Sequence, residues 1–433
     1  MTDDVHFYDR AVETLSRKEL HALQDERLRV LLGKLTTNRF YFEKFHAAQI
    51  EPGQVECAED LRSLPFTTKQ ELVDEQIKQP PFGRLLTYPR SRYRYYHQTS
   101  GTSGRPLKWL DTEESWDWWT RCWAYVYRAA GVTSDDTVFC AFSFGPYLSH
   151  WTAISGGWRI GAMCISGGGM NSEQRLQSLI DNRATVIVCT PTYALHLAEA
   201  ARAAGIDLQS SAVRIGIHAG EPGASLPNVK RAIESAWGAT CFDHAGATEA
   251  GAWAFDCQAQ TGAIHLNEAE FIFEVIDPDS GDSLEEGRRG ELVITNLGRA
   301  GMPVLRYRTG DLVELITEPC PCGRQFARIK GGVLGRADDM IIVRGVNLYP
   351  SAIDDLIRSL PVIAEYEVNI HRVAGMDDLT VRIETQNVGS FEGAARELTR
   401  AFRAQYSIRV NVEQALSGSL PRYEFKARRF KRM

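Results

Sequence analysis

Short apolar runs alternate with helix-forming segments through the middle of the chain, and this alternation constrains the fold more than any other feature. The runs have the length and composition of buried strands and cover residues 137–142, 162–165, 185–189, 213–218 and 239–242. Helical segments, such as 172–182 and 193–204, lie between them. Strands separated by helices form β-α-β units and a largely parallel sheet. We therefore predict an α/β fold.

Polar clusters follow several of these runs. Ser143-Phe144-Gly145 follows the first, Ala219-Gly220-Glu221-Pro222 the fourth, and the segment His244 to Glu249 the last. In open parallel sheets, ligands bind at the carboxyl ends of the strands. The sequence therefore predicts a binding site where these clusters meet.

The pattern changes after residue 270. The strand-like runs 271–276 and 290–296 flank the turn-rich stretch Asp277 to Gly281, which is typical of an antiparallel hairpin. The remaining segment, about 340–433, holds two helical and three strand-like stretches, enough for a small α+β domain. We place the boundary near Asp338, which gives domains 1–337 and 338–433.

The stretch Thr99-Ser100-Gly101-Thr102-Ser103-Gly104 combines hydroxyl side chains with two glycines, and Arg105 and Lys108 follow it. Glycines turn the backbone and expose consecutive N–H groups, which form a concave anion site. Hydroxyls add donors and the basic residues add positive charge. The loop predicts a polyphosphate site, and an ordinary Ser/Gly turn is the alternative. No Gly-Lys-Ser/Thr occurs, so it is not the G-x-x-x-x-G-K-[ST] loop.

Composition narrows the class of protein. A chain of 433 residues predicts two or three domains. The net charge of −6 argues against a nucleic-acid binder. No apolar run is long enough to cross a membrane, and the N-terminus lacks the pattern of a signal peptide. We therefore expect a cytoplasmic protein whose nine cysteines are reduced thiols or metal ligands.

Ordered motifs along nearly the whole chain match one family together. They are Leu64 to Lys69, Tyr95 to Lys108, Gly220-Glu221-Pro222, Ala247-Thr248-Glu249, Tyr307 to Asp311, Gly335 to Pro350 and Pro421 to Ala427. In these motifs the chain resembles the acyl-adenylate-forming (AMP-binding) superfamily and, within it, the phenylacetate–coenzyme A ligase family. Several motifs in the same order are far more specific than any one alone.

The resemblance implies a two-step ligase. ATP would activate an aromatic (aryl or arylacetic) carboxylic acid as acyl-AMP with release of pyrophosphate, and the acyl group would then pass to the thiol of coenzyme A. Transfer to a carrier-protein thiol or to an amine is the alternative. The implied fold has parallel sheets and a small antiparallel barrel in the N-terminal domain, and a mobile C-terminal lid. A carrier protein and a second copy of the chain, as a homodimer, are left open as partners.

The resemblance also implies the nucleotide contacts. The loop near residue 100 would hold phosphates, residues 220–222 would border adenine, and Asp311 would accept the ribose hydroxyls. Glu249, after Thr248, would bind Mg²⁺, because this hard cation prefers carboxylate oxygen. The implied nucleotide-binding residues are Thr99, Ser100, Gly101, Thr102, Ser103, Gly104, Lys108, Gly220, Glu221, Pro222, His244, Ala245, Asp311 and Arg336.

Lys426 is implied as the residue of the adenylation step. A lysine can neutralise charge between the attacking carboxylate and the α-phosphate. It belongs to a strongly basic C-terminus, and such runs are usually solvated. The surrounding Pro-Arg-x-Glu-x-Lys-Ala pattern distinguishes Lys426 from its neighbours. The resemblance places Asp338 at the hinge of the moving domain.

The acyl pocket is expected at the strand ends, where aromatic and apolar residues suit an aryl or arylacetic acid. His150 and His218 are interpreted either as ligands of a ring hydroxyl or amino group or as core histidines. The predicted substrate-binding residues are Phe144, Tyr147, His150, His218, Ala219 and Gly246.

Two positions depart from the family pattern. Ala245 stands where a tyrosine usually stacks on adenine, and Phe242 or His244 is the candidate to compensate. Phe425 stands where a glycine is common before the lysine, which bears on the active pose of Lys426 and on the coenzyme A step.

Cys257, His265, Cys320 and Cys322 form a second group of candidate ligands. Three thiolates and one imidazole would complete a tetrahedral structural Zn²⁺ site. The C-x-C spacing is less specific than C-x₂-C, and unrelated buried thiols are the alternative. Some members of the resembled family look similar at these places, which favours zinc.

Overall fold

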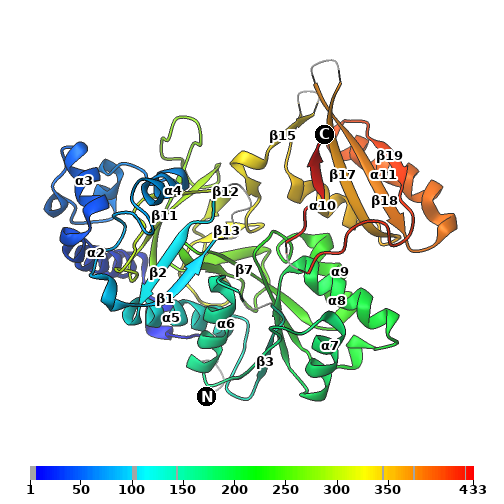
Figure 1. The fold of residues 1–433 in the computed structure, drawn as a ribbon, viewed down its shortest axis with the longest axis horizontal. Coiled ribbons are helices and arrows are strands. Elements are labelled where there is room, and N and C mark those ends of the chain that lie inside the picture. Colours follow the sequence, from blue (N-terminus) through cyan, green and yellow to red (C-terminus); the bar gives the residue numbers. More distant parts are fainter. Residues whose placement is uncertain (1–5, 100–104, 143–144, 344–345, 374–375, 425) are drawn as a thin grey trace.

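The computed structural model describes residues 6–99, 105–142, 145–343, 346–373, 376–424 and 426–433. Figure 1 shows a large body that holds most of the chain and a smaller C-terminal body beside it. The predicted α/β class and the separate C-terminal domain are confirmed. The segment Ser100–Gly104 and Phe144 lie outside the described residues.

One half of the large sheet is parallel, as predicted. Its strands, in spatial order, are β4 (Met163–Ser166), β3 (Thr137–Cys140), β5 (Val186–Cys189), β6 (Ile215–Ala219) and β7 (Thr240–Ala247). Each predicted run overlaps one of them. The last strand continues beyond the predicted end at 242, so His244 to Ala247 lie within β7 and not after it.

Helices cover both faces of this half because successive strand residues point to opposite sides. In β5, Val186 and Val188 pack into one core, whereas Ile187 and Cys189 pack into another. The helices on the first side are α5 (Glu113–Ala129) and α6 (Leu148–Arg159), and those on the second side are α7 (Ser172–Asp181), α8 (Pro191–Ala203) and α9 (Pro227–Trp237).

The other half of the sheet is antiparallel and begins at β7, which pairs in parallel with β6 and antiparallel with β8. Beyond β7 the strands, in spatial order, are β8 (Gly251–Phe255), β9 (Ala263–Leu266), β13 (Arg328–Lys330), β12 (Tyr307–Ile316), β11 (Arg289–Asn296) and β10 (Phe271–Ile276), and β14 (Gly335–Arg336) pairs with β12. The predicted hairpin is the β10–β11 pair. Strand β7 therefore joins the two halves.

The N-terminal region adds helices and a hairpin to the large body. The hairpin consists of β1 (Tyr93–Gln98) and β2 (Lys108–Thr112), and Thr112 caps α5. The helices are α1 (Arg10–Glu13), α2 (Arg17–Lys34), α3 (Arg39–Ala47) and α4 (Lys69–Lys78). The short 3₁₀ helices among the described residues are Leu35–Thr37, Pro52–Gln54, Glu59–Ser63, Arg90–Arg92, Leu208–Ser210, Ala337–Asp339 and Val388–Ser390. Within the described ranges, no helix has both the length and the apolar character needed to cross a membrane.

The C-terminal body has its own sheet and its own core. The strands, in spatial order, are β16 (Val346–Leu348), β15 (Ile341–Val343), β18 (Met376–Thr385), β17 (Ile363–Val373) and β20 (Phe430–Arg432), with β19 (Asn411–Gln414) beside β18. The two expected helices are α10 (Pro350–Arg358) and α11 (Phe391–Tyr406). The sheet has more strands than predicted because β15, β16 and β20 are too short to show a period. The 3₁₀ turn at the predicted hinge lies between β14 and β15.

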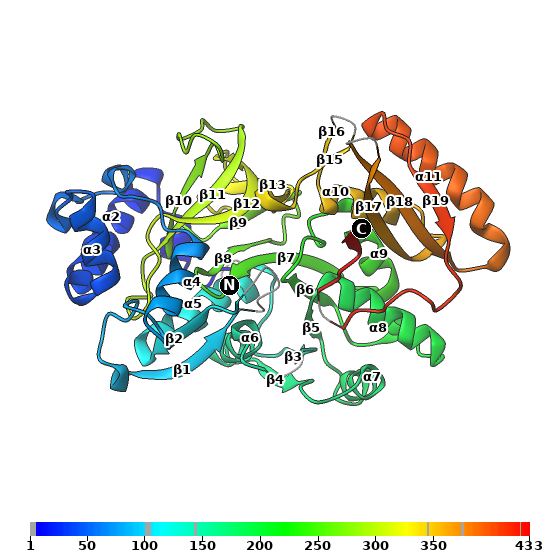
Figure 2. The same cartoon turned by 45° about the horizontal axis from the view of Figure 1, so that its top comes forward.

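The two bodies touch where α10 meets α9 (Figure 2). Helix α9 begins after Leu226, whose side chain cannot cap it. Asp355 of α10 supplies the missing acceptor, because its Oδ1 accepts a hydrogen bond from the backbone N–H of Asn228 at 2.8 Å. The C-terminal domain therefore caps a helix of the large domain.

Candidate active site

Lys426 brings the C-terminal segment to the site predicted at the strand ends. Its Cε lies 3.5 Å from the position that a Cβ would occupy on Gly220, and the φ of +95° at Gly220 favours glycine. The residue keeps solvent exposure, yet burial around its ammonium group lowers the pKa of Lys426. Glu221, Asp311 and Glu249 act in the opposite direction on this pKa. The structure thus gathers four predicted site residues around one ammonium group.

Glu249 is buried and already has polar neighbours. The Tyr307 hydroxyl donates a hydrogen bond to its Oε1 at 3.1 Å, and Lys69 Nζ lies 3.4 Å from the same oxygen. The sequence did not assign a role to either neighbour. The signal for Lys69 was present, since it ends the motif that begins at Leu64.

Arg299 fixes the turn that carries Glu249. Its guanidinium donates to the carbonyl oxygen of Thr248 at 2.5 Å and to that of Glu249 at 3.1 Å. The same group pairs with Asp111 of β2, and neither side chain is exposed. The turn between β7 and β8 is therefore linked to the hairpin that bears the predicted phosphate loop. No motif in the sequence identified Arg299.

Asp311 and Arg336 face each other across β12 and β14, with Nη1 and Oδ1 3.4 Å apart. Burial raises the pKa of Asp311 to about 6, although Arg336 and Lys426 lower it. Gly310 precedes Asp311 and has a φ of +76°, a backbone conformation that favours glycine. The arrangement leaves a carboxylate beside Lys426 that can accept hydrogen bonds from hydroxyl groups.

One face of β7 carries Asp243, which the sequence did not predict as a site residue. Burial raises its pKa to about 6, and the Ser225 hydroxyl donates a hydrogen bond to its Oδ2. Gly332 packs over this pair, since a Cβ there would lie 2.5 Å from Ser225 Oγ. Ala245, two residues along the strand, is half-buried. This face therefore presents the carboxylate of Asp243 and, two residues further on, the small side chain of Ala245.

The opposite face of β7 carries His244. Its Nδ1 lies 2.8 Å from the carbonyl oxygen of Ala254, which can only accept, so Nδ1 carries the proton. Trp123 of α5 packs edge-to-face against the ring at 4.5 Å. Burial lowers the pKa of His244 to about 4, so the ring is neutral at pH 7. Nε2 is therefore a hydrogen-bond acceptor.

The base of the predicted phosphate loop is closed by Thr99. Its backbone N–H donates to the carbonyl oxygen of Leu107 at 3.0 Å, and its Oγ1 accepts from the N–H of Leu107 at 3.0 Å. Lys108 begins β2 and pairs through its backbone with Gln76 of α4. The middle of the loop, 100–104, is not among the described residues.

The residues predicted for the acyl pocket fall into different environments. Tyr147 precedes α6 and Ala219 ends β6, and both are half-buried. Gly246 follows His244 on β7 and is exposed. His218 is fully buried, with Nδ1 3.3 Å from the carbonyl oxygen of Cys189. Phe144 and the side chain of His150 lie outside what the structure describes.

The four candidate zinc ligands meet in space. The ligand atoms of Cys257, His265, Cys320 and Cys322 all lie within 4.8 Å of one another. Cys257 Sγ is 3.8 Å from Cys320 Sγ, and Cys322 Sγ is 3.4 Å from His265 Nε2. Hydrogen bonds among the three thiols raise the pKa of Cys257 and lower the pKa of Cys322. This donor set fits a tetrahedral cation and is too crowded for three uncompensated thiolates.

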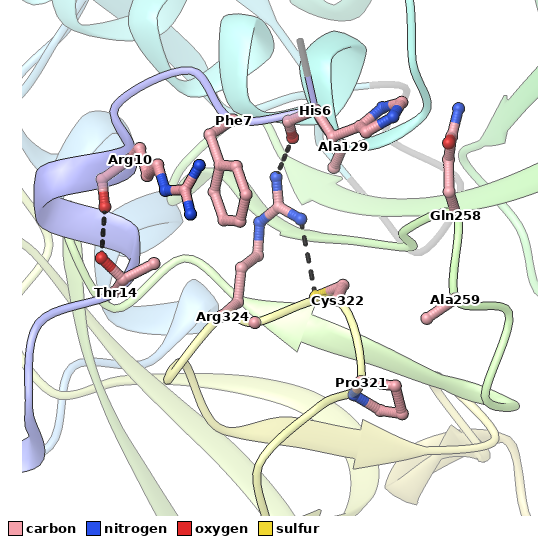
Figure 3. A pocket seen from close by; sticks show the side chains of 11 residues that line it. His6, Phe7, Arg10, Thr14, Ala129, Gln258, Ala259, Pro321, Cys322 and Arg324 are labelled. Atoms are coloured by element: carbon pink, nitrogen blue, oxygen red, sulfur yellow. Dashed lines mark hydrogen bonds between the residues drawn. The ribbon is translucent and has the colours of Figure 1, made fainter. Parts of the chain in front are cut away.

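A cavity of about 560 Å³ lies beside this cluster, between the N-terminal segment and the turn that carries Cys322 (Figure 3). Arg324 crosses it, donating to the backbone oxygen of His6 and to Cys322 Sγ. Glu13 of α1 forms a buried ion pair with the same guanidinium at 2.5 Å. The cavity is lined by none of the predicted nucleotide-binding residues, and Arg324 braces the cysteine turn.

Comparison with known proteins identifies the class. A family model described as AMP-binding enzyme matches residues 15–301, and one described as AMP-binding enzyme C-terminal domain matches 345–432. The phenylacetate-coenzyme A ligase of Escherichia coli K12 is 32% identical over 96% of this chain and 95% of its own. That of Thermus thermophilus is 32% identical over 87% of this chain and 84% of its own.

Solved structures of a related CoA ligase match the fold of the whole chain. A 2-hydroxyisobutyryl-CoA ligase in the postadenylation state, bound to R3-HIB-AMP, matches with a TM-score of 0.94 and 28% identity over 100% of this chain and 94% of that one. The same enzyme in the thioesterification state, bound to 2-HIB-AMP and CoA, matches with a TM-score of 0.76. The identity is 29%, and the match covers 99% of this chain and 93% of that one. The domain arrangement described above therefore resembles the postadenylation state.

Fold and site together define an AMP-forming acid–thiol ligase, which makes an acyl-adenylate from ATP and transfers the acyl group to coenzyme A. The chain belongs to the AMP-binding enzyme family, with phenylacetate–coenzyme A ligases among its relatives. The predicted superfamily and family are confirmed.

Proposed function

We propose that the acid is aromatic, either aryl or arylacetic. The curated relatives over most of the chain are phenylacetate ligases by name. On the face of β7 next to α5, His244 offers a neutral acceptor, and Trp123 packs edge-to-face against its ring. A hydroxyl or amino substituent on the acid would satisfy this acceptor.

The observation that carries the adenylation step is the position of Lys426, whose Cε lies 3.5 Å from the Cβ position of Gly220 and whose ammonium group is acted on by the charges of Asp311 and Glu249. Lys426 would hold positive charge at the reacting carboxylate and α-phosphate, and Asp311 would accept the ribose hydroxyls. Thr99, Lys108 and the loop between them would hold the other phosphates. The carboxylate of Glu249 suits Mg²⁺, which supplies charge neutralisation at phosphate oxygens when bound.

We also propose that Cys257, His265, Cys320 and Cys322 hold a structural Zn²⁺. Three sulfurs and one imidazole nitrogen complete a four-coordinate site, which leaves no position open for catalysis. The cluster joins β8–β9 to the turn before β13. The metal would therefore stabilise the antiparallel half of the sheet and not take part in the reaction.

A cytoplasmic location accords with the chemistry of the cysteines, because all nine are free thiols in the structure. Coenzyme A is the acceptor that the family supports, and a carrier-protein thiol or an amine is the alternative outcome of the test. A homodimer is the candidate assembly, and the mass of the protein in solution tests it.

Pyrophosphate release with a panel of acids tests the proposal. The panel contains benzoate, phenylacetate, their hydroxy and amino derivatives, and 2-hydroxyisobutyrate, each with and without coenzyme A. We expect release with aromatic acids and a thioester only when coenzyme A is present. Preference for the aliphatic acid would refute the proposed substrate class, and turnover without coenzyme A but with an amine would favour the alternative acceptor.

A further inference from the structure

Glu221 connects the Lys426 segment to the parallel sheet. Its Oε2 accepts a hydrogen bond from the backbone N–H of Ala427 at 3.0 Å, and its Oε1 accepts one from the backbone N–H of Thr192 at 2.9 Å. Thr192 lies in the first turn of α8, so the carboxylate sits at the positive end of that helix. Both oxygens therefore face the joint between α8 and the C-terminal segment.

Two arginines attach the same segment to α8 on either side of Lys426. Arg422 donates to both carboxylate oxygens of Glu199, at 2.9 and 3.0 Å. Arg429 donates to Thr192 Oγ1 at 3.3 Å and is buried with its ion-pair partner Glu365. Figure 2 shows this last part of the chain passing beside α8. Of these attachments, the bond from Ala427 to Glu221 is the one next to Lys426 in sequence.

Glu221 also acts on the charge of the lysine. Burial lowers the pKa of Lys426, and of the neighbouring charges Glu221 has the largest effect, which is to raise it. Lys69 lowers this pKa further by repulsion. The negative charge of Glu221 therefore favours the protonated form of Lys426, which charge neutralisation requires.

We propose that Glu221 is a positioning residue for Lys426, fixing the backbone of Ala427 so that the ammonium group is held beside Asp311 and Glu249. The inference rests on the proposed function of Lys426, and it gives Glu221 a role beyond the predicted border of adenine. The two backbone donors need two acceptors. Glutamate supplies both, whereas glutamine has one carbonyl oxygen and must give up one of the two bonds.

Two measurements on Glu221→Ala and Glu221→Gln test this. Hydrogen exchange at the peptide containing Ala427 measures the hydrogen bond from its N–H to Glu221 and requires no turnover. We expect faster exchange in both variants, with the larger increase in the alanine variant. Single-turnover pyrophosphate release reads the consequence. We expect the maximal rate to fall about 10- to 100-fold with little change in the concentration of ATP that half-saturates it, because a displaced catalytic group costs rate.

Arg428→Gln is the matched control, since Arg428 lies in the same segment, outside the Pro421 to Ala427 motif, and is exposed. It should leave exchange at Ala427 and the rate of adenylation unchanged. Unchanged exchange in Glu221→Ala would overturn the proposal, as would weaker ATP saturation at an unchanged maximal rate, which indicates an adenine contact. A wild-type protein that releases no pyrophosphate with any acid contradicts the proposed function instead, and the exchange measurement still decides the contact.

Discussion

Arg299 and Asp111 form an ion pair in which neither side chain is exposed to solvent, with Nη2 2.6 Å from Oδ2. Trp109 and Trp119 lie about the guanidinium, with ring centroids 5.2 and 5.1 Å from its central carbon. The same guanidinium bonds to the backbone of Thr248 and Glu249. One buried pair thus holds the proposed magnesium ligand in register with the hairpin that carries the phosphate loop.

Arg299→Met should destabilise the protein strongly, because it leaves Asp111 buried without its partner. Removal of one member of a buried pair costs about 3–5 kcal/mol. Thermal unfolding measures the effect. Arg289→Met is the control, since its pair with Glu314 has one partner 73% exposed, and exposed pairs contribute about 1 kcal/mol or less. Equal shifts in the two variants would contradict the role given to Arg299.

Asp311 should give the reaction a pH dependence. Burial raises the pKa of Asp311 to about 6, so this carboxyl gains its charge as pH rises through 6. The ionised form is the one that accepts both ribose hydroxyls, and kcat/KM for ATP should therefore rise over pH 5–7. His218 and His244 have pKa values lowered to about 4 by burial and do not titrate in this range.

Asp311→Asn isolates this effect. The variant should lose affinity for ATP, and its profile should lack the limb near pH 6. Dividing the wild-type profile by that of the variant removes the ionisation of ATP itself. A limb that persists in the variant would assign the titration to another group, such as Asp243 or Asp256, whose pKa values burial also raises to about 6.

His244 should decide between acids that differ in a hydrogen-bond donor. His244→Leu removes the acceptor and keeps an apolar side chain against Trp123. We expect kcat/KM for hydroxy- or amino-substituted aromatic acids to fall about 10-fold relative to the unsubstituted acid, the magnitude of one buried hydrogen bond. His218→Leu is the comparison, and because His218 contacts Cys189 within the core, it should lower thermal stability without changing this ratio. If His218→Leu changed the ratio and His244→Leu did not, the specificity role would belong to His218.

The cysteine cluster should bind about one zinc ion per chain. Metal analysis of Cys322→Ser should show a loss of zinc, and thermal unfolding should begin at a lower temperature because the cross-link between β8–β9 and the cysteine turn is gone. Cys57→Ser removes a free thiol outside the cluster and should keep the metal. Zinc-free wild-type protein that unfolds like the metal-loaded form would show that the four ligands have no structural role.

Much of the parallel half was predictable because its strands contain short apolar runs, and the central strand β5 is buried on both faces. The length of β7 was not, since Asp243, His244 and Gly246 break the apolar pattern while the backbone pairing continues. The motifs placed Glu249, Asp311 and Lys426 at one site. Arg299 was missed because its role depends on contacts with residues far away in sequence, which local patterns do not encode. Lys69 lies in a motif that the sequence shows, but no role was assigned to it.

The role of Lys426 is tested most directly by separating the two half-reactions in Lys426→Ala. We predict that pyrophosphate release falls at least about 100-fold, as expected for removal of a charged group from the reacting centre, while ATP still binds and a synthetic acyl-adenylate is still converted to the thioester with coenzyme A. Pyrophosphate release at the wild-type rate would contradict the account.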